Sequence, residues 1–279
     1  DWAGRARARR LFRGAVRRWR TRTDVFERAL RSRSVFGRIL MSDLATGRPH
    51  LVINAADLRT QTAFRFTRAR AGSWRSGEVV DYEFRLSEAV AASAAFPVLL
   101  PSIDRSFVCA RDGVETRRRV LLTDGGIYDN LGVQVFDRDR PAKYAFALEP
   151  VDIVIACIAE PGLPSGEDAP QFLVARLRTA FSTVHRQLHV SGFAMLHAWR
   201  AAGAIQRLVM PYLGQDDSKL PEVKDLPPPT EIGSLRDYPV DFDAMPDDAC
   251  EALVRRGYEQ TRWLLSHYMK DDALDWRAP

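Results

Sequence analysis

The first half of the chain contains short apolar runs of strand length. Residues 50–54 and 64–67 predict two β-strands, with a turn over 57–60 between them. A third run, 120–122, predicts a strand that leads directly into Asp124. Because open α/β sheets place their ligands at strand ends, this carboxylate occupies a position typical of a functional site.

The second half combines one strand pattern with longer helical patterns. The aliphatic run 151–158 predicts a central strand that is buried on both faces, and 170–200 predicts a long helix. Small residues over 89–95 predict a compact helix capped by Ser87. Asp247 is expected to cap a last helix with one apolar stripe, formed by Cys250, Leu253, Val254, Tyr258, Leu265 and Tyr268. Strands mixed with helices favour an α/β layered fold.

Arginine is concentrated at the beginning of the chain. Apolar residues recur there at helical spacing, with arginines in between. We therefore divide the chain into a basic amphipathic helical segment, 1–40, and a main portion, 41–279. Three interpretations of the segment stay open: a solvated linker helix that covers part of the core, peripheral contact with an anionic membrane, and nucleic-acid binding. Nucleic acid is the least favoured, since no recognised binding motif accompanies the charge.

Composition restricts the class of protein. The chain has 279 residues, of which 46% are hydrophobic and 28% charged, and a formal net charge of +5, as in an ordinary globular protein. No run approaches the length of a membrane span. Cys109, Cys157 and Cys250 show no metal-ligand spacing and are interpreted as buried thiols. Without a recognisable signal peptide, we expect a cytoplasmic location, with room for peripheral membrane contact.

The strongest chemical signal is LLTDGGIYDNLGV, residues 121–133. Asp124 suits a general base, and Gly125 and Gly126 permit positive φ and close approach of a substrate to the backbone. On spacing alone, a structural turn is the simpler interpretation. Asn130 is interpreted as structural, and Asp129 receives no role.

A metal site is a weaker possibility. His185 and His189 stand four apart on a predicted helix, but a zincin would need glutamate where Arg186 stands. We expect neither a metal nor a cofactor.

Several segments, taken in order, resemble the patatin-like phospholipase family. They are PHLVINAADLRTQTAFRF (49–66), SEAVAASAAFPVLLP (87–101), LLTDGGIYDNLGV (121–133), the strand over 151–159, LPPPT (226–230) and RRGYEQTRWLL (255–265). The resemblance implies a three-layer α/β/α patatin-like fold and a Ser-Asp dyad hydrolase that cleaves the acyl ester of a glycerolipid or another acyl ester. It also implies that Asp124 is the catalytic aspartate and that Gly125 and Gly126 contact substrate.

The chain departs from the family at the nucleophile. Neither a GxSxG elbow nor a glycine-rich oxyanion loop is present in the 279 residues. We therefore expect the C-terminal part of a patatin-like domain, incomplete at its N-terminal side, which supplies the aspartate but lacks the serine and is inactive alone. The alternative is a catalytically inactive pseudoenzyme that binds lipid or docks on a membrane.

Overall fold

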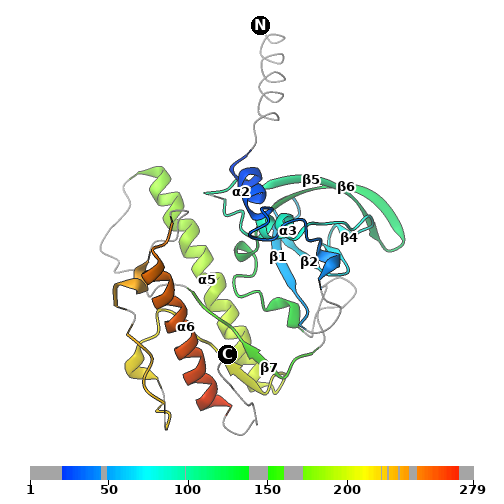
Figure 1. The fold of residues 1–279 in the computed structure, drawn as a ribbon. Helices are drawn as coiled ribbons and strands as arrows, with labels where there is room; N and C mark the ends of the chain where they lie inside the picture. The colour runs from blue at the N-terminus through cyan, green and yellow to red at the C-terminus, as the bar shows by residue number, and fades with distance from the viewer. Residues whose placement is uncertain are drawn as a thin grey trace. The chain divides into compact units, whose positions relative to one another are not determined.

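The computed structural model describes residues 21–44, 49–97, 99–137, 150–159, 172–220, 222–224, 226–231, 233–238 and 244–269 (Figure 1). The chain forms two compact units, Asp1–Leu148 and Glu149–Pro279. Both units mix helices with strands, which confirms the predicted α/β class. The amphipathic pattern predicted within residues 1–20 lies outside the described residues.

The strands of the first unit form a closed antiparallel barrel in sequence order. They are β1 (Val52–Asp57), β2 (Thr62–Thr67), β3 (Ala71–Ser73), β4 (Gly77–Val79), β5 (Ile103–Arg111) and β6 (Val114–Asp124). β1 and β2 correspond to the two predicted strands, and β6 extends the third toward the N-terminus. The barrel closes where β6 pairs with β1, and Ala55 lies opposite Asp124 in that register.

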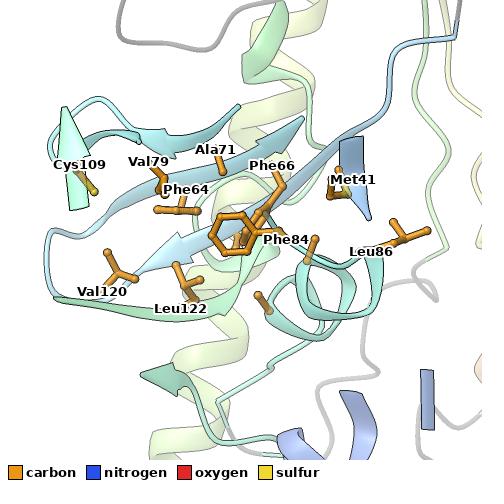
Figure 2. Close-up of a cluster of buried hydrophobic side chains, with 13 residues drawn as sticks. Met41, Phe64, Phe66, Ala71, Val79, Phe84, Leu86, Cys109, Val120 and Leu122 are labelled. Atoms are coloured by element: carbon orange, nitrogen blue, oxygen red, sulfur yellow. The ribbon is translucent and has the colours of Figure 1, made fainter. Parts of the chain in front are cut away.

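Aromatic side chains form much of the core of this unit (Figure 2). Phe64 and Phe66 of β2 are almost fully buried, and the Phe66 ring lies 5.1 Å from the ring of Phe84. Val120 and Leu122 of β6 belong to the same cluster. Burial of these rings supplies apolar area that a small barrel needs, and so holds the strand ends in place.

Two helices belong to this unit. α2 (Arg22–Leu30) begins with a capping box formed by Thr21 and Asp24. α3 (Leu86–Ser93) ends before Pro97 as predicted, but its N-cap is Arg85, so the predicted cap at Ser87 is wrong. Ser87 instead lies in the first turn of α3, and its hydroxyl donates to Glu27 Oε1 of α2 at 2.7 Å.

The second unit contains two strands and two long helices. β7 (Ile153–Ile155) and β8 (Arg207–Val209) pair in parallel, and the helices are α5 (Leu173–Ala201) and α6 (Asp247–Tyr268). The predicted strand over 151–158 is therefore shorter than expected. It is also not buried on both faces, because Ile153 and Ile155 are exposed.

The buried face of α6 differs from the predicted stripe. Val254 is 68% exposed, whereas Arg256 and Gln260 are almost completely buried. Gln260 Nε2 donates to the carbonyl of Tyr212 at 2.8 Å, so hydrogen bonds compensate for burying polar groups there. The helix begins after Pro246, and Asp247 lies in its first turn without capping it.

Short 3-10 helices lie in the loops: η1 (Met41–Asp43), η2 (Gly125–Ile127), η3 (Gln134–Phe136), η4 (Asp217–Lys219) and η5 (Gly233–Asp237). Of the three cysteines, Cys109 is buried as predicted, but Cys157 and Cys250 are exposed. Among the described residues, no helix has both the length and the apolar character to cross a membrane.

Candidate functional site

Asp124 is the last residue of β6 and is held from two sides. The buried carboxylate of Asp57 accepts the backbone N–H of Leu121 at 2.9 Å, which fixes β6 against β1 three residues earlier. The N–H of Asp124 donates to the carbonyl of Ala95, just beyond α3, at 3.1 Å. The Cα of Asp124 is therefore fixed by a strand on one side and by the end of a helix on the other.

The carboxylate of Asp124 faces the start of η2. Its Oδ1 accepts the N–H of Gly126 at 2.6 Å, so Asp124 is the N-cap of this short helix. A hydrogen bond from a backbone N–H fixes the orientation of the carboxylate. An oriented carboxylate at a strand end suits a general base.

Gly125 is required by close packing. Neither Gly125 nor Gly126 has a positive φ, so the conformational freedom expected from the sequence does not explain these glycines. A Cβ added at Gly125 would lie 2.4 Å from the carbonyl oxygen of Asn54, which belongs to the β1 backbone. Only glycine lets the turn after Asp124 approach β1 this closely.

We expect Gly125→Ala to destabilise the first unit by about 1–3 kcal/mol, the usual cost of overpacking. The clash is with backbone, so the turn carrying Asp124 must shift instead of a side chain rotating away. Urea denaturation followed by circular dichroism measures the loss. Gly113→Ala is a poor control because of its positive φ, whereas Gly257→Ala meets nothing within 4 Å and should be neutral or mildly stabilising. Equal stability of Gly125→Ala and wild type would contradict the packing argument.

A buried arginine contacts the residue of β1 on which the Asp124 turn packs. Arg65 on β2 is only 3% exposed, and its Nε donates to Asn54 Oδ1 on β1 at 3.2 Å. Asn54 and Arg65 are partners in the antiparallel register. Because a buried guanidinium is costly unless it is paired, this contact ties Arg65 to the strand on which the Asp124 turn packs.

Asp129, five residues after Asp124, is a second carboxylate that lines a cleft together with Asp124. It is 8% exposed, and its Oδ2 accepts the N–H of Gln134 at 2.9 Å. Burial raises the pKa of the Asp129 carboxyl, while the N–H of Gln134 and the charge of Arg65 act in the opposite direction. Its own N–H donates to the carbonyl of Gly125 at 2.9 Å, so Asp129 closes the loop that begins at Asp124. Its role is therefore structural.

An open cleft of about 500 Å³ lies over this turn. Its lining includes the polar residues Asp124, Asn54, Ser93, Asp129 and Asn130 and the apolar residues Val52, Ile53, Val90 and Leu131. Both glycines after Asp124 also line it. A cleft lined by apolar side chains and a few polar groups suits an ester with a hydrocarbon chain.

The structure brings all three predicted site residues, Asp124, Gly125 and Gly126, into this cleft. The sequence did not point to Asn54 or Ser93, which come from β1 and from the last turn of α3. Strand and helix residues of these types carry no local signal for a site. Pairing of β1 with β6 and the bond from Asp124 to Ala95 bring both residues beside the aspartate.

The two histidines of the predicted pair lie on α5, in the second unit. His189 is 4% exposed, and its ring centroid lies 4.5 Å from that of Phe193. Within the described ranges, no group of three or more His, Cys, Asp and Glu side chains is arranged to hold a metal ion. Packing against Phe193 accounts for the position of His189.

Comparison with known proteins gives one result. Neither the curated proteins nor the solved structures gave a match. The model of the family "Patatin-like phospholipase" matches residues 1–137, which end before the predicted similarities at 151–159, 226–230 and 255–265. The matched region contains the whole cleft around Asp124. Over this first part, the chain is similar to the patatin-like phospholipases, and the match supports a lipid hydrolase at the level of that family.

Proposed function

We propose that this chain supplies the general base, Asp124, of a Ser-Asp dyad hydrolase that cleaves acyl esters of lipids. The observation that carries the proposal is the oriented carboxylate of Asp124 in a cleft lined by both polar and apolar residues. This cleft lies within the region similar to patatin-like phospholipases. The nearby Asp129 is buried, whereas Asp124 is only partly buried at the end of β6, which makes Asp124 the better placed of the two carboxylates.

In this mechanism a serine attacks the ester carbonyl while Asp124 accepts its proton. The same carboxyl group then gives the proton to the leaving alcohol, and water hydrolyses the acyl-enzyme. No GxSxG elbow occurs in the 279 residues, so the serine in this proposal comes from outside them. Backbone N–H groups near that serine would stabilise the oxyanion.

Fluorophosphonate labelling of the native, full-length protein from its source tests this function. A fluorophosphonate reacts with an activated serine, and peptide mass then locates the modified residue. We expect a label on a serine in a GxSxG peptide, and we expect butyrate esters to compete with the label. A folded protein that takes no label and hydrolyses no ester would overturn the proposal and favour a lipid-binding protein without catalysis.

We also propose that the basic segment before α2 contacts anionic membranes. Eight arginines and no lysine lie within residues 1–20, together with Leu11, Phe12 and Trp19. A basic residue close to an anionic surface contributes about 1 kcal/mol, so several together hold a protein on a membrane at low salt.

Vesicle sedimentation tests the membrane contact. We expect the chain to sediment with vesicles of phosphatidylcholine plus phosphatidylserine, to lose binding as salt rises, and to bind phosphatidylcholine alone weakly. A variant that begins at Thr21 keeps the capping box of α2 and serves as the matched control. Equal binding of both forms would assign the contact to another surface. Salt-dependent binding of duplex DNA without vesicle binding would favour the nucleic-acid interpretation.

A further inference from the structure

The orientation of the Asn54 side chain is fixed by its neighbour. Arg65 has only N–H donors, so the amide atom that faces Arg65 Nε at 3.2 Å is the oxygen of Asn54. The NH₂ group must then face the other way. Because Arg65 is itself buried on β2, it acts as a fixed support that prevents the amide from flipping.

The NH₂ group of Asn54 lies at the cleft. A Cβ added at Gly132 would be 3.2 Å from Asn54 Nδ2, and both residues line the cleft together with Asp124. Among the residues that the structure describes, only Arg65 forms a hydrogen bond with the Asn54 side chain, and it uses the oxygen. The two amide hydrogens are therefore available to a molecule in the cleft.

The chemistry of the dyad indicates which part of an ester reaches Asn54. The base that takes the serine proton must deliver it to the leaving alcohol, so its carboxyl group lies on the alcohol side of the ester. The oxyanion forms on a different oxygen and needs donors near the serine. Donors beside Asp124 therefore face the alcohol half of the substrate.

The polar groups of the cleft suit an alcohol that carries further hydroxyls. The oxygen of a hydroxyl group can accept a hydrogen bond from the Asn54 amide. Ser93, the last residue of α3, also lines the cleft and offers a second hydroxyl partner.

We propose that Asn54, oriented by Arg65, binds a hydroxyl oxygen on the alcohol half of the ester and gives the enzyme a preference for esters whose alcohol carries further free hydroxyls, such as monoesters of glycerol. This inference rests on the proposed function, since it requires Asp124 to act on an ester in the same cleft. Asn54 is a specificity residue in this proposal, and Arg65 is a positioning residue.

The test compares two esters that share one acyl group. Glycerol monobutyrate offers free hydroxyls, and ethyl butyrate offers none. We expect the full-length wild type to have a higher kcat/KM for glycerol monobutyrate. Asn54→Ala should lower that preference, the ratio of the two kcat/KM values, about tenfold or more, because a site built to bind a hydroxyl loses its donor. Asn54→Asp keeps the size of the side chain and an acceptor for Arg65, so it removes the donor in a folded protein.

The possible outcomes distinguish a failure of the proposed hydrolase function from a failure of the role proposed for Asn54. A wild type that hydrolyses neither ester overturns the proposed function and this inference with it. An active wild type whose Asn54 variants keep the full preference, or lose activity equally on both esters, overturns only the inference. For Asn54→Asp the added charge can raise the pKa of Asp124, so the preference is measured across pH. A preference that returns at high pH would also overturn the inference, because the missing donor does not return with pH.

Discussion

Asp124→Asn is expected to lower kcat of the full-length protein for a butyrate ester by about 10² to 10⁴, the usual contribution of a positioned general base. The amide has almost the same size as the carboxylate, and its oxygen can still accept the N–H of Gly126, so the N-cap of η2 survives. What it cannot do is accept the proton of a serine. Steady-state kinetics at saturating ester, together with a thermal unfolding curve, measures both properties.

Asp112→Asn is the matched control for this change. Asp112 is an exposed aspartate at the β5–β6 turn, and its φ of 53° suits asparagine well. We expect it to keep both kcat and stability. If Asp124→Asn retained near-normal turnover, Asp124 would have no part in the mechanism. If it unfolded instead, the capping bond would need the charge, and turnover by the folded fraction would decide the question.

Asp217→Ala is expected to destabilise the second unit by about 2–3 kcal/mol. Its carboxylate binds the guanidinium of Arg256, with Asp217 Oδ2 at 3.0 Å from Nη1 and a second contact between Oδ1 and Nη2. Arg256 is 1% exposed, so loss of Asp217 leaves a buried charge that, within the described part of the chain, still has a hydrogen bond to the carbonyl of Thr230 alone. The estimate lies below the full cost of a buried pair because the Asp217 side chain is 35% exposed.

Urea denaturation followed by tryptophan fluorescence is the measurement, since Trp263 is a buried residue of α6, the helix that carries Arg256. Asp216→Ala is the control: this exposed neighbour accepts a hydrogen bond from Ser218 and pairs with Lys219 at 3.3 Å, and its loss should destabilise the unit much less than loss of Asp217. The double variant Asp217→Ala with Arg256→Met should recover most of the stability, because the buried charge is gone while the packing remains. No recovery would show that the hydrogen-bond geometry, and not the buried charge, dominates.

The sequence alone determined those features that depend on neighbouring residues. An apolar run followed by Asp124 and two glycines predicted a carboxylate at a strand end, and the structure has this arrangement because strand, cap and turn are all set within a few residues. The two N-terminal strands and the long helix of the second unit were predicted for the same reason. Their side-chain periodicities are local properties of the chain.

The tertiary structure decided what depends on contacts between distant residues. Gly125 is explained by the backbone of Asn54, 71 positions earlier, and not by its own φ. The sequence of β2 predicts only an alternating strand, but Arg65 is buried because β1 pairs with β2 and places Asn54 opposite it, and because Asp129 of the loop after β6 lies close enough for their charges to interact. On α6, Leu265 of the predicted apolar stripe is buried, but Arg256, which lies outside that stripe, is buried too because Asp217 is available to pair with it. A buried polar residue is stable only if its partner is present, and a sequence pattern does not show which distant residue that partner will be.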